Sequence, residues 1–244
     1  MAYDPLQAVL REAAAAVRSA LAGYEGHGLS GGRETQYGLD LVADQAACTV
    51  LLGAGLSVFS EESGRQGDGE LLAVIDPVDG STNADRGIPF YCVSICVLDE
   101  QGPRVSLVEG LPTGVIYEAM RGHGATRDGT PISTSGKTEE TGIMVGVNGL
   151  LTERQPWAQF RTMGSAALEM CLVADGALDG YVQAGGASLH PWDYLGALLI
   201  VEEAGGYVAA ESDEPLIVAV DEPRRPVVAA TKELAELLSK RCPL

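Results

Sequence analysis

The sequence predicts a layered α+β fold in which helices pack against sheets, and three observations lead to this class. The 244 residues are 46% hydrophobic and 20% charged, which is typical of a globular chain long enough to bury a substantial core. The first half carries helical patterns followed by a run of strand-like segments. The second half alternates helix and strand. We expect an N-terminal half at 1–135 and a C-terminal half at 136–244, which together form one compact unit.

Two helices are expected near the N-terminus. Asp4 is a suitable N-cap and Pro5 suits a first turn, after which apolar residues recur at helical spacing. A stretch rich in glycine and polar residues at 23–38 predicts a mobile loop. A second apolar helical pattern follows at 40–56, and a short strand that runs into a turn is expected at 57–63.

Short β-rich segments follow one another at 90–99, 104–110 and 114–120. Gly, Pro and Asp separate them, so they predict neighbouring strands of one sheet. Asp128 and Gly129 form a dipeptide that favours a hairpin turn.

The second half predicts a smaller set of alternating elements, beyond a soft boundary near 133–140. We expect strands at 142–149 and 178–183, helices at 164–176 and from about Asp193 to the Gly205-Gly206 stop, and a last strand and helix within 226–241. Thr231 is the expected cap of the last helix.

Composition excludes several classes of partner. Acidic residues outnumber basic ones 34 to 16, which gives a formal net charge of −18. This charge repels nucleic acid and anionic membranes, and no basic, aromatic-rich stripe is present, so neither is expected as a partner. Five cysteines without a CxxC pair favour a reducing, cytoplasmic location. The sequence contains no run of about 18 uninterrupted apolar residues, so we expect no membrane-spanning helix.

The segment VIDPVDGSTN, residues 74–83, carries two carboxylates at the end of an apolar strand. Pro77 removes a backbone donor and interrupts the strand, so Asp76 and Asp79 can converge and the carbonyl of Val78 is free to bind an ion. Carboxylates this close need a counter-charge, and the segment contains no Lys or Arg. Ligands that are all oxygen suit Mg²⁺, whereas zinc favours His or Cys. With an acidic pair upstream, the segment predicts a magnesium site.

Three segments, EES at 61–63, VIDPVDGSTN at 74–83 and PWDYLGALLIVEEAGG at 191–206, resemble in this order the inositol monophosphatase family of Mg²⁺-dependent, lithium-sensitive phosphatases. GSAALEMCLVADGALDGYV at 164–182 also fits, so the resemblance covers nearly the whole chain. It implies the αβαβα sandwich of the fructose-1,6-bisphosphatase-like fold, usually as a homodimer, with two or three Mg²⁺ ions.

The resemblance also implies roles for individual residues. Metal ligands are expected at Glu62, Asp76, the Val78 carbonyl, Asp79 and Asp193. Within the acidic pair, Glu62 is preferred to Glu61 because it stands directly before the serine. Ser81 is expected to orient the attacking water, which Asp44 activates through that hydroxyl. The phosphate cradle is expected at the amides of Gly80, Ser81 and Thr82, a role that small residues at a helix start allow.

Substrate contacts are expected at Asp79, Ser165, Ala166, Gln183 and His190. Gln183 stands where the inositol-cleaving enzymes carry a glutamate, and it has no charge to attract a cationic group. This weighs against histidinol phosphate and leaves inositol and sugar phosphates open. Alternatives for the last two residues are a solvent-facing position for Gln183 and a packing role for His190.

The expected function is hydrolysis of a small polyol, inositol or sugar phosphate by attack of a metal-activated water. One alternative is a bisphosphate phosphatase, acting on 3′-phosphoadenosine 5′-phosphate or fructose 1,6-bisphosphate. A second phosphate would need a basic pocket, for which Arg121, Arg127 and Arg161 are the candidates. A metal-binding interaction module without activity is the non-enzyme alternative, and it would predict a broken ligand set, whereas the expected set is complete.

Overall fold

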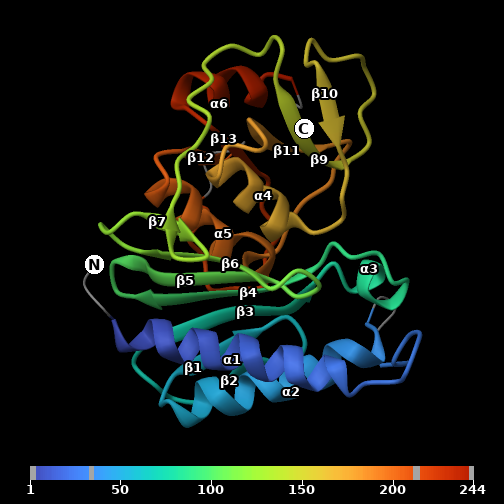
Figure 1. Cartoon of the computed structure of the whole chain (residues 1–244), viewed down its shortest axis with the longest axis vertical. Coiled ribbons are helices and arrows are strands. Elements are labelled where there is room, and N and C mark those ends of the chain that lie inside the picture. Colours follow the sequence, from blue (N-terminus) through green and yellow to red (C-terminus); the bar gives the residue numbers. More distant parts are fainter. Residues whose placement is uncertain (1–3, 33–35, 211–214, 242–244) are drawn as a thin grey trace.

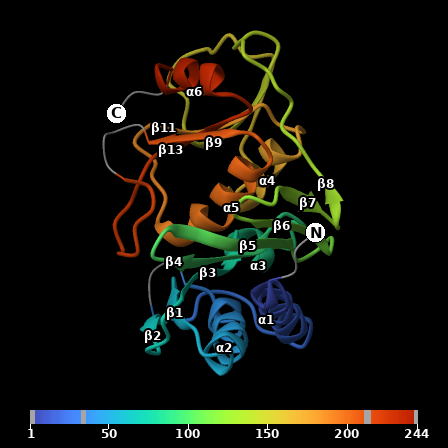
Figure 2. The same cartoon turned by 90° about the vertical axis from the view of Figure 1, so that its left-hand side faces the viewer.

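The computed structural model describes residues 4–32, 36–210 and 215–241. Five layers are stacked in the order helix pair, sheet, helix pair, sheet, helix (Figures 1 and 2). The helices are α1 (Pro5–Ala22), α2 (Gly38–Gly53), α3 (Ser81–Asp85), α4 (Ala166–Ala174), α5 (Pro191–Glu203) and α6 (Lys232–Ser239). The predicted αβαβα arrangement is confirmed, with α1 and α2 outside the first sheet and α4 and α5 between the two sheets.

The first sheet has eight strands in the order β2-β1-β3-β4-β5-β6-β7-β8 among the described residues. Its strands are β1 (Ser57–Ser60), β2 (Gly64–Gln66), β3 (Leu72–Asp79), β4 (Cys92–Asp99), β5 (Gly102–Gly110), β6 (Val115–Met120), β7 (Ala125–Arg127) and β8 (Thr130–Pro131). All neighbours are antiparallel except β1 and β3, which pair in parallel. This parallel pair places the turn after β1 beside the end of β3.

The second sheet has the order β10-β9-β11-β13-β12. Its strands are β9 (Met144–Gly149), β10 (Gln159–Arg161), β11 (Gly180–Ala184), β12 (Tyr207–Ala210) and β13 (Pro226–Ala229). Buried apolar side chains form three clusters, between α1/α2 and the first sheet, around α4 and α5, and between the second sheet and α6. None of the helices that the structure describes is both long and apolar enough to cross a membrane.

Local signals place several element ends correctly. Asp4 Oδ1 accepts a hydrogen bond from the Leu6 amide at 3.0 Å, and Thr231 Oγ1 accepts one from the Leu234 amide at 3.2 Å, so both predicted caps are confirmed. Asp128 has φ 51° and forms the two-residue turn between β7 and β8.

Two helix bounds differ from prediction. α2 ends at Gly53 because Gly55 adopts a left-handed φ of 81° and leads the chain into β1. α5 begins at Pro191 rather than near Asp193, because proline is well placed in the first turn and Asp193 caps from the third position.

Two ion pairs connect α1 to strands of the first sheet. Arg18 bonds Glu109 of β5, and Arg11 bonds Glu118 of β6 with an Nε–Oε1 distance of 2.7 Å. Both glutamates are buried, with 1% and 5% exposure. A buried carboxylate that loses its cation is strongly destabilising.

Arg18→Met is therefore expected to lower the free energy of unfolding by about 2–3 kcal/mol, since Glu109 would stay buried without its cation. Urea denaturation measures the change. Arg241→Met is the control, because the Arg241–Glu140 pair lies at the surface and is expected to contribute less than about 1 kcal/mol. Equal losses in the two variants would contradict the role given to the buried pair.

Candidate active site

Three carboxylates from separate elements converge at one point. One oxygen each from Glu61, Asp76 and Asp193 lies within 4.8 Å of the others. Glu61 follows β1, Asp76 belongs to β3, and Asp193 lies in the first turn of α5. The parallel pairing of β1 with β3 brings the first two together, and α5 packs against the first sheet to bring the third.

The acidic pair after β1 corrects one sequence prediction, because Glu61 rather than Glu62 belongs to the cluster. The Glu61 amide donates to the carbonyl of Ile75 at 3.2 Å, which holds Glu61 beside Asp76. The Glu62 carboxylate accepts a hydrogen bond from Gln36 instead. Glu61 and Glu62 lie in the turn between β1 and β2, and only Glu61 has a carboxylate oxygen within the cluster.

The carboxylates of the cluster raise one another's pKa values. Burial, together with the neighbouring acids, raises the pKa of Asp76 and of Asp193 well above the ordinary range. Burial and the nearby Glu62 and Asp40 raise the pKa of Glu61 to about 7. Within the described residues, neither Asp76 nor Asp193 forms an ion pair with Lys or Arg. The missing counter-charge and the oxygen-only donors fit a hard divalent cation.

Asp40 is an acid of this neighbourhood that the sequence analysis missed. It is 4% exposed on α2, and its charge contributes to the raised pKa values of Glu61 and Asp76. It stands one helical turn before Asp44, so the two acids share a face of α2. This i, i+4 pair was the signal that could have revealed it.

The end of β3 contains the predicted interruption. Asp76 pairs with Ser94 and Asp79 with Cys92, so Pro77 and Val78 face a single residue of β4. The Val78 amide folds back to donate to Asp76 Oδ1 at 3.0 Å. The strand nevertheless continues to Asp79, whose charge contributes to the raised pKa values of Asp76 and Asp193.

Asp79 is held by the N-terminus of α4. Its carboxylate accepts hydrogen bonds from Ser165 Oγ at 2.9 Å and from the amides of Ala166 and Ala167 at 3.2 and 2.7 Å. Burial raises the pKa of Asp79 to about 6, and these three donors oppose the rise. Asp79, Ser165 and Ala166, the three predicted substrate contacts of this region, therefore bond one another in this structure.

Asp44 is tied to the turn after β1. Its Oδ1 accepts hydrogen bonds from Ser60 Oγ, from Ser63 Oγ at 3.1 Å and from Cys48 Sγ at 3.3 Å. No hydrogen bond within the described chain joins Asp44 to Ser81, so the predicted relay through that hydroxyl is not formed in this structure. The two serines that bond Asp44 instead lie at the end of β1 and in the turn that follows it.

The predicted phosphate cradle lies where β3 turns into α3. Gly80 has φ 96°, and a Cβ there would lie 2.9 Å from the carbonyl oxygen of Gly164, so only glycine fits. α3 begins at Ser81, and the first amides of a helix have no intrahelical acceptor. Thr82 Oγ1 lies 3.2 Å from the Tyr37 hydroxyl. The backbone therefore presents Gly80, Ser81 and Thr82 in one tight turn.

The comparisons with known proteins agree with this geometry. Residues 2–243 match the model of the inositol monophosphatase family. The chain belongs to this family. It is 35% identical over 184 residues to a fructose-1,6-bisphosphatase/inositol-1-monophosphatase of Archaeoglobus fulgidus, covering 72% of this chain and 71% of that protein. The structure of an inositol monophosphatase from Anabaena (Nostoc) sp. PCC 7120 matches with a TM-score of 0.80 at 28% identity, covering 98% and 96% of the two chains.

The similarity to some relatives covers only part of their length. A Nus factor SuhB of Xylella fastidiosa is 33% identical over 168 residues, which cover 62% of this chain. The chain spans 59% of the length of that relative. The family resemblance expected from the three sequence segments is confirmed.

A pocket of about 190 Å³ adjoins the carboxylate cluster in this family member. Asp79, Ser165, Ala166 and Asp193 line it, together with Glu169, which the sequence analysis did not consider as a site residue. The pocket lies where β9 and β11 of the second sheet meet α4 and α5. The pocket therefore lies directly beside the carboxylate cluster, with which it shares Asp193.

Two predicted substrate contacts lie outside this pocket lining. Gln183 accepts from Asn148 Nδ2 at 2.8 Å and donates to the carbonyl of Pro226 at 3.4 Å, so its amide bonds the protein rather than facing the pocket or solvent. His190 stacks on Trp192 with ring centroids 5.2 Å apart, and its Nδ1 lies 2.6 Å from Asp221 Oδ1. For His190 the structure agrees with the packing alternative.

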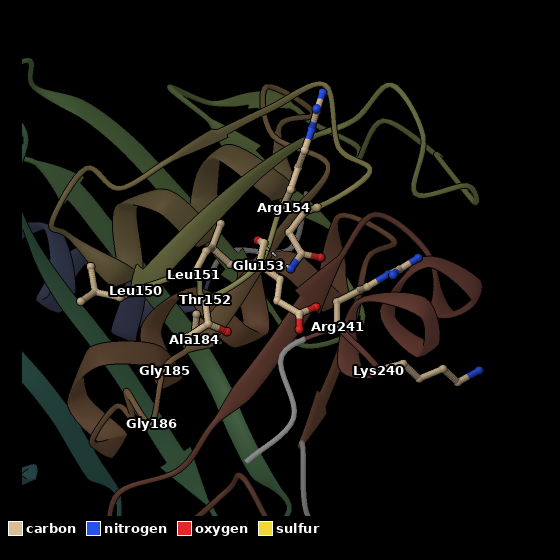
Figure 3. Close-up of a pocket in the computed structure, with 11 residues that line it drawn as sticks. Leu150, Leu151, Thr152, Glu153, Arg154, Ala184, Gly185, Gly186, Lys240 and Arg241 are labelled. Carbon is tan, nitrogen blue, oxygen red and sulfur yellow. Dashed lines mark hydrogen bonds between the residues drawn. The ribbon is translucent and has the colours of Figure 1, made fainter.

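A larger cavity of about 490 Å³ lies elsewhere on this family member, between the 150–155 and 184–186 loops and the end of α6. Figure 3 shows that the basic ends of Arg154, Lys240 and Arg241 point apart. Arg241 is also paired with Glu140. Because its charges do not converge and the carboxylate cluster is not part of its lining, this cavity is not the candidate active site.

Proposed function

We propose that the chain is a Mg²⁺-dependent phosphomonoesterase that hydrolyses a phosphate ester of a small hydroxylated alcohol, such as a polyol, inositol or sugar. The observation that carries the proposal is the cluster of Glu61, Asp76 and Asp193 beside a pocket of about 190 Å³. The printed names of the relatives support the reaction class, since an Inositol monophosphatase 1 of Homo sapiens is 32% identical over 205 residues.

Glu61, Asp76 and Asp193 would hold the cation, with the Val78 carbonyl as the predicted backbone ligand. A bound divalent cation would lower the pKa of a water molecule and would offset the negative charge of the phosphate oxygens. The raised pKa values of the cluster support this assignment, because a bound cation would offset the burial and the mutual repulsion of acids that raise them.

The remaining residues position the substrate. The amides of Gly80, Ser81 and Thr82 are the proposed hydrogen-bond donors to the phosphate oxygens, since the start of α3 leaves them without intrahelical partners. Asp79 holds the N-terminus of α4 against β3, and this contact fixes one wall of the pocket. Asp44 offers a carboxylate held by two serines as the proposed proton acceptor.

The surroundings of three arginines favour a monophosphate over a bisphosphate. Arg121 is paired with Asp99 and Arg127 with Asp175. Arg161 bonds its own neighbours Phe160 and Gln159. No Lys or Arg is found among the described residues that line the pocket, so a second phosphate has no cation to meet.

Phosphate release from a panel of esters tests the proposal. The panel contains inositol 1-phosphate, glycerol 3-phosphate, glucitol 6-phosphate, histidinol phosphate, fructose 1,6-bisphosphate and 3′-phosphoadenosine 5′-phosphate. We expect release from a hydroxylated monophosphate with Mg²⁺ and none with EDTA. Asp193→Asn is expected to lower kcat/KM by about 10³-fold, because the cluster loses one of its charges. Absence of release from every ester, or full activity of Asp193→Asn, would refute the proposed function.

A further inference from the structure

Glu169 is a buried carboxylate whose two oxygens have different surroundings. It lies in α4 and is 2% exposed. Oε1 accepts hydrogen bonds from the amides of Met163 and Gly164 at 2.9 and 3.1 Å. Oε2 has no hydrogen-bond partner among the described residues. A buried acceptor without a donor is costly, so this oxygen indicates a donor that comes from outside the protein.

The surroundings of Oε2 show where that donor would lie. Glu169 lines the same pocket as Asp79 and Asp193. Oε2 packs against the backbone of β9, where a Cβ on Gly146 would lie only 2.7 Å from it. A larger residue at this position would displace the carboxyl group. Glu169 therefore both packs against β9 and lines the pocket beside Asp79 and Asp193.

Other polar groups nearby do not supply the missing partner. Both amide atoms of Gln183 bond Asn148 and Pro226. Burial raises the pKa of Glu169 to about 7, the amides of Met163 and Gly164 oppose this rise, and the charge of Asp79 adds to it. An uncharged donor group in the pocket would satisfy Oε2.

We propose that Glu169 Oε2 accepts a hydrogen bond from a hydroxyl group of the leaving alcohol, which makes Glu169 a specificity-determining residue for hydroxylated esters. The inference rests on the proposed phosphatase function and adds to it the chemistry of the alcohol. A pocket that leaves a buried acceptor unsatisfied rejects an ester without the hydroxyl more strongly than an apolar pocket would.

Glu169→Gln is the informative variant, because glutamine keeps an Oε1 for the two amides and replaces only Oε2 by an NH₂ donor. The substrates are matched pairs: inositol 1-phosphate with cyclohexyl phosphate, glucitol 6-phosphate with hexyl phosphate, and glycerol 3-phosphate with propyl phosphate. We expect the variant to lower kcat/KM for the preferred hydroxylated ester by about 10- to 100-fold and to leave its deoxy partner within about 2-fold. Glu153→Gln, in the larger cavity, is the control and is expected to change neither member of a pair.

The outcomes separate the inference from the function on which it rests. If wild-type protein hydrolyses the esters and Glu169→Gln lowers both members of a pair equally, or neither, the inference is wrong and the proposed function stands. If Glu169→Gln lowers activity on histidinol phosphate alone, the donor to Oε2 is a protonated amine rather than a hydroxyl, and the inference is overturned. If wild-type protein releases phosphate from no ester with Mg²⁺, both are overturned. Thermal unfolding of each variant confirms that it is folded.

Discussion

Glu61→Gln is expected to lower kcat/KM for Mg²⁺-dependent phosphate release by about 10³-fold, whereas Glu62→Gln lowers it by about 10-fold at most. The two residues are adjacent and identical in type, and the sequence led us to prefer Glu62 because it stands directly before the serine. The structure separates them, because the Glu61 carboxylate lies with Asp76 and Asp193 while that of Glu62 bonds Gln36. Glutamine keeps the shape of each side chain and removes only the charge.

Steady-state kinetics over a range of Mg²⁺ concentrations distinguishes the two variants. For Glu61→Gln the Mg²⁺ concentration that gives half-maximal activity is expected to rise together with the loss of rate, since a ligand has been removed. For Glu62→Gln it is expected to stay near the wild-type value. A larger loss in Glu62→Gln would restore the ligand choice made from sequence and would contradict the geometry of the cluster.

The parts of the fold that the sequence predicted correctly depend on local patterns. The caps at Asp4 and Thr231 and the turn at Asp128 need only a few neighbouring residues to form. The layered arrangement also follows, because helical and strand-like periodicities are long in this chain. Short strands such as β10 and β12 escaped prediction, since three or four residues contain too little periodicity to recognise.

The parts of the site that could not be predicted depend on contacts across the chain. Which glutamate of the pair faces the cluster is decided by Gln36 and by the carbonyl of Ile75. The direction of Gln183 is decided by Asn148 on the neighbouring strand β9. No local pattern contains these partners.

Glu169 could have been found from sequence by a different signal. Eight of the nine residues of α4 are buried, and the segment is apolar on every side apart from this acid. A helix that is apolar all round lies in the interior, so a single carboxylate within it must be buried as well. Such an acid needs a partner, and this requirement distinguishes Glu169 from an ordinary surface glutamate.

Without divalent cations, the protein is expected to become less stable as the pH rises from 5 to 8. The folded-state pKa of Glu61 is about 7 against an ordinary value of 4.5, so the folded protein binds this proton more tightly than the unfolded chain does. The stabilisation is fully present below about pH 4.5 and is lost as the pH passes through about 7. This difference corresponds to a loss on the order of 3 kcal/mol, or about 5–10 °C in Tm for a chain of this size.

Other acids do not reverse this trend in the chosen window. The pKa values of Asp76 and Asp193 are also raised, so both act in the same direction as Glu61. Asp99 and Glu140 have lowered pKa values because of Arg121 and Arg241, so their contributions change only below about pH 4.5. Burial also raises the pKa values of Asp79 and Glu169, to about 6 and about 7, so the slope between pH 5 and 8 reports on the buried acids of the cluster and the pocket together.

Differential scanning fluorimetry at pH 5, 6.5 and 8, with EDTA or with Mg²⁺, measures this dependence. Saturating Mg²⁺ is expected to raise the Tm at pH 8 and to flatten its pH dependence. At a concentration 100 times its dissociation constant, the ion would raise the free energy of unfolding by about 2.7 kcal/mol. Asp76→Asn is expected to raise the Tm at pH 8 in EDTA, because it removes one repelling charge, and to abolish activity. A Tm in EDTA that stays level or rises from pH 5 to 8 would contradict the charge imbalance on which the cation site rests. A Tm that falls as expected would mean that the acids of this site destabilise the metal-free fold and that the bound ion offsets this loss.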